Sequence, residues 1–308
     1  MMPSLYTGSY SDNGDFPTRA FPTRRTELMK TALTVIVAIV VLVGVNAADA
    51  GNIVLTGHDN DFHWNFGANP GNSGAAGIAL GAELAFVRAG STSPTLPVLV
   101  IDTSANSGTL ELGNAATGLL GAANVVVKAP SAITAADFNP AIYSAFAVAS
   151  ENTCGGCDLL ATDVALITAQ KTAIAAFLNA GGGILSLAGA ADPLAYAYIP
   201  ASATNAGGSP PSTGYVQTAL GASLGLPAVN GNPTHNFFFE PGSGGFSAAY
   251  GVTERLLNAT TGTPETAACV ACTTAVLLAP EPGSLALLGI GLLGLAAAAW
   301  WRKRRTAG

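Results

Sequence analysis

Short apolar segments alternate with helical segments between Gly51 and Ser186, and this alternation limits the fold more than any other feature of the chain. Five segments are typical of buried strands: GNIVLTG, LPVLVIDTS, NVVVKAP, YSAFAVAS and GGILSLAG. Between them, residues 74–90 and 158–183 have helical patterns, and Asp158 lies at the expected cap of the second, longer helix. Apolar strands that alternate with helices predict an α/β fold, a mainly parallel three-layer sandwich.

The pattern changes after Ser186. The segment IPASATNAGGSPPSTGY is typical of a loop, and YVQTALGASLG predicts a short helix. The segment NPTHNFFFEPGSGGFSAAYGV is compatible with a β-rich insertion or an irregular loop. Residues 258–279 are rich in Thr, Ala and Gly and predict a linker. We therefore expect one α/β domain over residues 51–257, followed by a linker over 258–279.

The C-terminus combines an extended motif, an apolar run and a basic cluster. The run from Leu285 to Trp301 carries no charge, and a helix of about 17 residues reaches roughly 26 Å, near the lower limit for spanning a bilayer. The basic residues Arg302, Lys303, Arg304 and Arg305 follow it and are expected to stay in the cytoplasm. Pro280 and Pro282 flank Glu281 and keep the stretch before the predicted helix extended. This order predicts a transmembrane helix over 285–301.

Residues 280–308 resemble a PEP-CTERM sorting signal, because Pro280-Glu281-Pro282, the apolar span and the basic cluster occur in that order. The resemblance implies a substrate of a membrane-embedded exosortase in a Gram-negative bacterium that makes exopolysaccharide. The enzyme would cut near the Pro-Glu-Pro motif and release or transfer the rest of the chain. An ordinary single-span anchor is the alternative, since an anchor needs only the apolar and basic parts.

Residues 29–50 have the layout of a secretory signal peptide. Lys30 supplies a positive charge, Thr31–Val45 the apolar core, and Ala48-Asp49-Ala50 a small-residue cleavage pattern. We expect residues 1–50 to contain a signal peptide that is handled by the Sec translocon and removed; an uncleaved anchor is the alternative. Residues 1–28 either form an unusually long n-region or precede the true start at Met29, and we favour the later start. The signal peptide and the sorting signal together predict that the protein resides transiently in the inner membrane. They predict a final location on the outer surface or in the extracellular matrix.

Between these ends the chain is acidic. Residues 51–279 contain 13 acidic side chains and 4 basic ones, a net charge of −9. Nucleic-acid binding needs a basic surface that neutralises phosphates, so this class is excluded.

The four cysteines form two close pairs, Cys154 with Cys157 and Cys269 with Cys272. In an oxidising exterior, an even count at close spacing favours disulfides. A redox-active Cys154–Cys157 pair, a zinc site built from both pairs and free thiols are the alternatives.

The order of strands and helices around FLNAGGGILSLAG resembles the class I glutamine amidotransferase-like fold, including its ThuA-like relatives. The catalytic members carry a cysteine on the turn after this strand, whereas this chain has Leu187, Ala188, Gly189 and Ala190. Amidotransferase chemistry therefore does not carry over, and we expect no enzyme activity of that class and no cofactor.

The segment GHDNDFHWNFG directly follows the first predicted strand, and ligands of α/β sheets bind at the carboxyl ends of strands. His58, Asp61 and His63 in this segment could hold a ligand or divalent metal, and His63 could act as a general base. The alternative is a polar loop in which Asp and Asn bond their own backbone. Asp102 and Glu151 follow other strands and could converge on the same edge.

Two functional classes follow. The first is a non-catalytic exported envelope or matrix protein associated with exopolysaccharide or biofilm. The second is an extracellular hydrolase or sugar-processing enzyme that uses the segment from His58 to His63.

Overall fold

The structure is a computed structural model, and it describes residues 50–65, 70–151, 158–189, 192–200, 203–208, 210–231 and 234–274. Several predicted features lie outside the described residues: the signal peptide up to Asp49, the motif at Pro280–Pro282, the apolar run 285–301, the basic cluster, and the pair Cys154 and Cys157. Among the described helices, none combines the length and apolar character that a membrane span requires.

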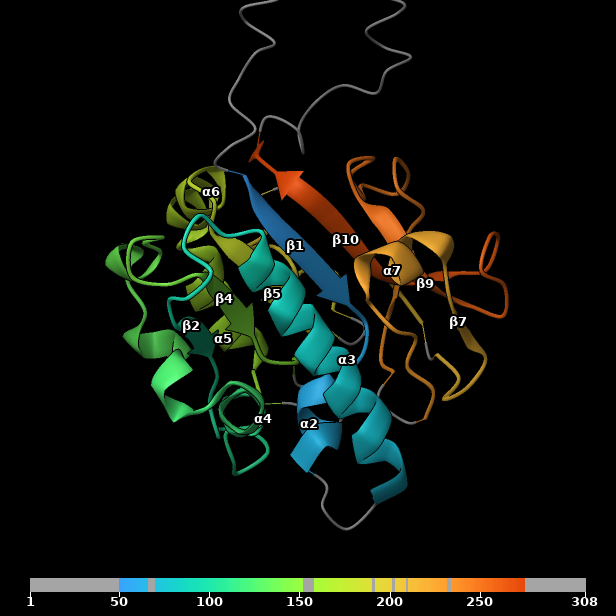
Figure 1. The fold of residues 1–308 in the computed structure, drawn as a ribbon, viewed down its shortest axis with the longest axis horizontal. Coiled ribbons are helices and arrows are strands. Elements are labelled where there is room, and N and C mark those ends of the chain that lie inside the picture. Colours follow the sequence, from blue (N-terminus) through green and yellow to red (C-terminus); the bar gives the residue numbers. More distant parts are fainter. Residues whose placement is uncertain are drawn as a thin grey trace, which may run out of the picture. The chain divides into compact units, whose positions relative to one another are not determined.

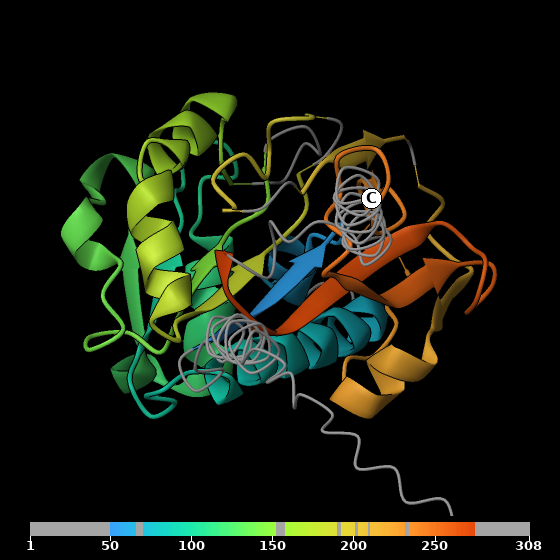
Figure 2. The same ribbon diagram turned by 90° about the horizontal axis from the view of Figure 1, so that it is seen from above.

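An eight-stranded sheet forms the centre of the domain, with the strand order β3-β2-β4-β5-β1-β10-β9-β7 (Figures 1 and 2). The first five strands in this order pair in parallel, and β10, β9 and β7 extend the sheet in antiparallel register. The strand bounds are β1 Gly51–Thr56, β2 Val98–Ile101, β3 Val125–Lys128, β4 Ala145–Val148, β5 Gly183–Ser186, β7 Tyr215–Gln217, β9 Gly251–Leu256 and β10 Pro264–Cys272. Two short strands, β6 Asn205–Gly207 and β8 Phe237–Phe238, form a separate pair.

Helices cover both faces of the parallel strands. The α-helices are α2 Asn60–Asn65, α3 Pro70–Ala89, α4 Glu111–Leu120, α5 Ala161–Thr168, α6 Lys171–Asn179 and α7 Ala219–Leu224, and three short 3-10 helices span Ala122–Asn124, Pro130–Ala132 and Ala135–Asp137. A Cβ added at Gly183 would lie 2.2 Å from the Val87 carbonyl oxygen of α3, whereas Phe146, on the opposite face, contacts Phe177 of α6. The mixed α/β class predicted from the alternation is therefore confirmed (Figure 2).

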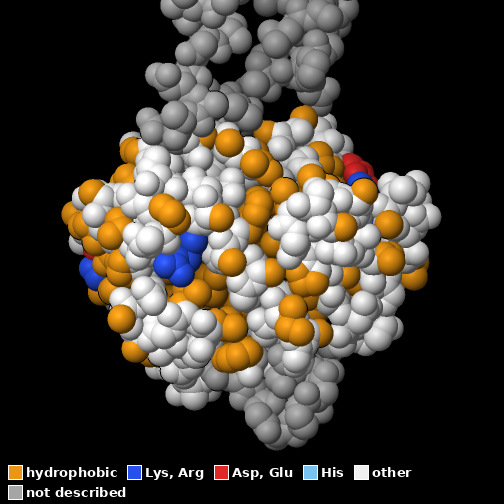
Figure 3. All heavy atoms as spheres, viewed as in Figure 1, with side chains coloured by type: hydrophobic (Ala, Val, Ile, Leu, Met, Phe, Trp, Pro, Cys, Tyr) orange, Lys and Arg blue, Asp and Glu red, His pale blue; other side chains and the backbone are white. Residues whose placement is uncertain are grey.

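The parallel strands are buried because both faces are covered. Every residue of β1, β2, β4 and β5 is buried, and their apolar side chains pack with Leu80, Leu84, Ile174 and Leu178 from the helices. On the face of α3 drawn in Figure 3, few charged side chains are visible among scattered apolar ones, as the low charge content of the chain leads one to expect.

The long helix predicted over 158–183 is two helices. Between α5 and α6 the backbone tightens, because the Gln170 N–H bonds to the carbonyl of Ile167 and the Thr168 hydroxyl bonds to that of Val164. Asp158 does not cap α5: Leu160 precedes this helix, and the Leu160 N–H donates to the Asp163 carboxylate over 2.9 Å. The prediction was wrong at the cap because Asp158 bonds to a different helix, accepting the Glu111 N–H at the start of α4 over 2.8 Å.

The linker predicted over 258–279 contains a central strand of the sheet. Residues 264–272 form β10, which lies between β1 and β9. Its alanines and threonines have the composition of a spacer, but pairing on both sides buries them, and Ala267 and Ala268 are 0% and 2% exposed. The described domain therefore extends beyond residue 257, through β10.

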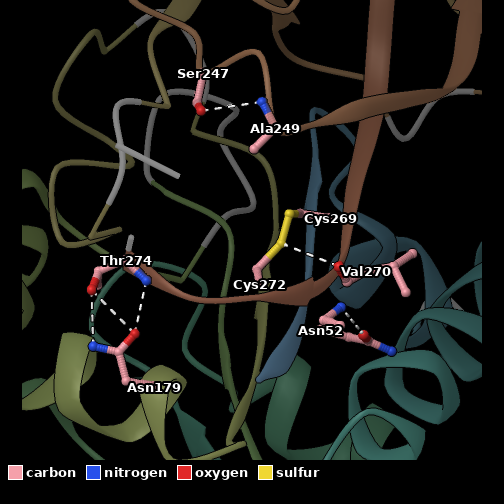
Figure 4. The surroundings of a disulfide bond; sticks show 9 residues. Asn52, Asn179, Ser247, Ala249, Cys269, Val270, Cys272 and Thr274 are labelled. Atoms are coloured by element: carbon pink, nitrogen blue, oxygen red, sulfur yellow. Dashed lines mark hydrogen bonds between the residues drawn. A yellow bond between two sulfur atoms is a disulfide. The ribbon is translucent and has the colours of Figure 1, made fainter. Parts of the chain in front are cut away.

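A disulfide bond between Cys269 and Cys272 closes the end of β10 (Figure 4). The strand bulges there, because Gly51 pairs with Cys272 while Ile53 pairs with Cys269, and Ala271 has a φ of 49°. The Ala271 N–H donates to the Asn52 side chain over 3.0 Å. The first residue of β1 and the last residue of β10 are thus partners at one edge of the sheet.

Candidate functional site

A polar region lies where β1 ends, at the carboxyl edge of the parallel strands. The loop after β1 leads directly into α2, so that His58, Asp59, Asp61 and His63 follow Thr56 within one short stretch. The antiparallel strands bring further groups to the same edge, because Thr56 pairs with Thr266 of β10 and Thr266 pairs with Glu254 of β9. These groups separate into three clusters with different partners.

The first cluster surrounds His58, which is completely buried. Its Nε2 lies 2.7 Å from Glu254 Oε2, and its Nδ1 lies 3.3 Å from the Thr234 hydroxyl. Glu254 also accepts the Val229 N–H over 2.6 Å and the Thr266 hydroxyl over 2.9 Å. Both ring nitrogens and both carboxylate oxygens are therefore engaged within the protein.

The charge of this cluster is governed by burial and by neighbouring carboxylates. Burial lowers the pKa of His58, but the charge of Glu254 and its hydrogen bond outweigh that effect and raise the pKa to about 9. Glu265 is also completely buried, and its Oε1 lies 3.9 Å from His58 Nδ1. Burial raises the pKa of Glu265 well above its usual range, and within the described residues neither of its oxygens accepts a hydrogen bond.

The second cluster consists of Asp59, His63 and His235. Asp59 Oδ2 lies 2.8 Å from His235 Nε2, and Asp59 Oδ1 lies 3.5 Å from His63 Nε2. One ligand atom from each residue lies within 4.8 Å of the other two. The side chain of Asp59 is 1% exposed, that of His63 10% and that of His235 23%. Among the described residues, this group has the side chains and the spacing that a metal ion requires.

The third cluster is acidic and lies around the end of β2. Asp61 accepts the Ser150 N–H over 2.9 Å and the Ser150 hydroxyl over 2.7 Å, and burial raises its pKa to about 7. Asp102 accepts the Gly113 N–H over 2.8 Å, and burial raises its pKa to about 6. Burial and the neighbouring Asp102 raise the pKa of Asp158 to about 8. These carboxyl groups therefore gain protons more readily than exposed ones do.

The structure places the predicted site residues at one edge but in different clusters. His58 pairs with Glu254, His63 with Asp59, and Asp61 with Ser150. Asp102 does approach Asp61 closely enough for their charges to interact, whereas Glu151 interacts electrostatically with Asp192. After β2, the Thr103 N–H donates to Asp102 Oδ1 over 2.7 Å.

Sequence reasoning missed His235, Glu254 and Glu265. His235 is one of only three histidines in the chain, and all three lie at this edge, which is the signal that could have found it. Glu254 interrupts the otherwise strand-like segment VTERLL, and a charged residue inside a strand is a signal for a buried partner. Glu265 lies in a stretch with the composition of a spacer, and no local signal marks it.

The turn after β5 contains no nucleophile. Leu187 and Ala188 are buried, the Ala188 N–H donates to the His58 carbonyl over 3.0 Å, and the Gly189 N–H donates to Asn236 over 2.9 Å. The backbone of this turn is therefore hydrogen-bonded to the loop after β1 and helps to position that loop.

Comparison with known proteins identifies a sorting motif that lies beyond the described residues. Residues 278–305 match the family model of the PEP-CTERM protein-sorting motif. The motif indicates an exported protein that exosortase sorts, which is processed at or anchored to the membrane on the way, and it confirms the sorting signal predicted from the C-terminal residues. Neither a curated protein nor a solved structure matches the chain.

Proposed function

We propose that the chain is a non-catalytic protein of the cell envelope or extracellular matrix that acts in association with exopolysaccharide. The sorting motif at residues 278–305 carries this proposal, because it directs export through exosortase. In the proposed route the Sec translocon exports the chain after recognition of residues 29–50, the apolar run 285–301 halts it in the inner membrane, and exosortase cuts near Pro280–Pro282.

The geometry around His58 supports a role without catalysis. A general base must reach a proton on a substrate, but His58 is completely buried and both of its nitrogens face protein groups. The rival proposal of an extracellular hydrolase therefore rests on His63, whose side chain is partly exposed, and no longer on His58.

The likeness to the amidotransferase-like fold is also a proposal. It is supported by β5, which follows the glycines at 181–183 and lies between β4 and β1 inside the sheet. The turn after β5, with Leu187 and Ala188 in place of a thiol, supports a use of such a fold without its chemistry.

Mass spectrometry of the protein from its native host, with and without the exosortase gene, tests the proposed route. We expect the mature chain to begin near Gly51 and to end near Pro280–Pro282, so that the basic cluster is lost. Deleting exosortase should restore the C-terminal peptide with Trp300. A chain that keeps Trp300 in cells with active exosortase would contradict the route.

A screen of that mature protein tests the role. We expect it to be retained on exopolysaccharide purified from the same host and to leave chromogenic ester and glycoside substrates unchanged. Turnover that is lost in His63→Ala would replace the non-catalytic proposal with the hydrolase.

A further inference from the structure

We infer that Asp59, His63 and His235 bind a divalent transition-metal ion of the Zn²⁺ class. The inference concerns the described domain alone and does not depend on the sorting route or on the proposed role. Two imidazoles and one carboxylate form a donor set that suits zinc and related ions, whereas calcium and magnesium prefer oxygen ligands.

The distance between Asp59 Oδ1 and His63 Nε2 fits a shared ion. Metal–ligand bonds of about 2.0–2.2 Å place two ligands of a tetrahedral ion roughly 3.3–3.6 Å apart. Asp59 Oδ1 and His63 Nε2 are 3.5 Å apart, whereas His235 Nε2 is hydrogen-bonded to Asp59 Oδ2 over 2.8 Å and would exchange this bond for the ion. Since all three ligand atoms lie within 4.8 Å of one another, small side-chain rotations complete the site.

An unsatisfied oxygen of Asp59 gives a second, independent indication. The residue is 1% exposed, and within the described residues its Oδ1 accepts no hydrogen bond. A buried carboxylate oxygen without a partner costs free energy, and such groups are rare in folded proteins. A metal ion at the centre of the cluster satisfies this oxygen.

The backbone holds the three ligands in place before any ion binds. The Phe62 and His63 N–H groups bond to the Asp59 carbonyl over 3.1 and 3.3 Å, which sets His63 one helical turn from Asp59. His235 comes from a distant segment, and its N–H donates to the Gly57 carbonyl over 2.8 Å. Both segments are therefore attached to the end of β1.

The cluster is also reachable from outside the protein. The 23% exposed side chain of His235 and the 10% exposed side chain of His63 provide a route for the ion, while Asp59 forms the buried wall. With three protein ligands, water can complete a tetrahedral sphere, as in zinc sites that keep an open position.

Isothermal titration of the full-length protein with ZnCl₂, after removal of metals with a chelator, tests the inference. We expect one ion per chain from this cluster. Asp59→Asn, His63→Ala and His235→Ala should each weaken binding at least about 100-fold, because removing a direct ligand costs no less than removing a supporting group. Glu240→Gln is the matched control, since Glu240 is an exposed carboxylate paired with Arg255, and it should bind zinc like the wild type.

Two further measurements keep the result interpretable. Titration in a Cys154→Ser/Cys157→Ser background excludes zinc binding by these two cysteines, and Cys269 and Cys272 are disulfide-bonded. Cobalt(II) bound in this background should show visible absorption from nitrogen and oxygen ligands without thiolate charge-transfer bands. Circular dichroism checks folding, and His235→Gln, at the most exposed position, replaces any variant that fails to fold.

A metal-free arrangement, in which the two imidazoles simply pair with Asp59, predicts different results. Zinc would then not bind stoichiometrically, or it would bind equally well to His63→Ala and His235→Ala. Either result overturns the inference.

Discussion

The two halves of the sheet bury different kinds of side chain. The parallel strands β2 and β4 bury only apolar side chains, whereas the antiparallel strands β9 and β10 bury Thr253, Glu254, Glu265 and Thr266. Apolar burial stabilises directly, at about 25 cal/mol per Å². Buried charges stabilise only when their partners are in place. Within the strands themselves, the parallel half therefore has an apolar core and the antiparallel half carries buried polar groups, with β1 shared by both halves.

Removing Glu254 should give the largest change in unfolding free energy that depends on a buried charge in the antiparallel half. Glu254→Ala leaves the buried His58 without the carboxylate at 2.7 Å, and loss of one partner of a buried pair costs about 3–5 kcal/mol of unfolding free energy. Denaturant unfolding at pH 6, where His58 is protonated, measures the cost. The cost should shrink above about pH 9, because neutral His58 no longer needs the carboxylate.

Phe146→Ala in the parallel half is the matched comparison. Phe146 is completely buried against Phe138 and Phe177, and such a truncation costs about 3–5 kcal/mol. Because no charge is involved, this cost should be equal at pH 6 and pH 9. A Phe146→Ala cost that varies with pH as much as that of Glu254→Ala would remove the distinction between the halves.

The stability of the whole domain should fall as the pH rises. Burial raises the pKa of Glu83 to about 7, that of Asp102 to about 6 and that of Asp158 to about 8, so the folded state holds more protons than the unfolded state. This stabilisation is complete below about pH 4, near the pKa values of these carboxyl groups in the unfolded state. It is lost as the pH rises past their pKa values in the folded state. For His58 the loss spans pH 6.5 to about 9 and is on the order of 3 kcal/mol.

Denaturant midpoints at pH 5, 7 and 9, with chelator present, measure this dependence. We expect the midpoint to decrease at each step. Glu254→Gln should flatten the step between pH 7 and pH 9, because it removes the charge that raises the pKa of His58. A midpoint that increases towards pH 9 would show that these groups are not protonated in the folded state.

The smallest of these effects concerns the end of β10. Cys269→Ser/Cys272→Ser opens a disulfide that closes a very short loop, and the loop-entropy relation gives a cost of about 2 kcal/mol. Thermal unfolding under non-reducing conditions measures it, and the single variant Val270→Ala, at an exposed position inside the loop, serves as a control. Equal melting temperatures for the double variant and the wild type would contradict the expectation.

The parallel half could be predicted from the sequence, and the antiparallel half could not. Strands such as Val98–Ile101 and Ala145–Val148 are continuous apolar runs, because helices bury both of their faces. Strand β10 consists largely of Ala, Thr and Cys, and nothing local distinguishes it from a spacer. Its place in the sheet depends on pairing with Gly51–Thr56, more than 200 positions earlier in the chain.

Only the part of the site that lies in one loop could be predicted from the sequence. His58, Asp61 and His63 directly follow the first strand, and ligands of α/β sheets bind at the carboxyl ends of strands. Their partners come from far along the chain: Glu254 lies 196 residues after His58, and His235 lies 176 residues after Asp59. Sequence spacing carries no information on contacts of that separation, so the division into clusters needed the structure.

The pairing of Gly51 with Cys272 decides how the domain can be tethered. Gly51 and Cys272 lie at the amino ends of the parallel strands, whereas His58 and His63 follow the carboxyl end of β1 and His235 is bonded to it. A tether attached through the segment before Gly51 or after Cys272 would therefore pull on the end of the sheet opposite to the imidazoles.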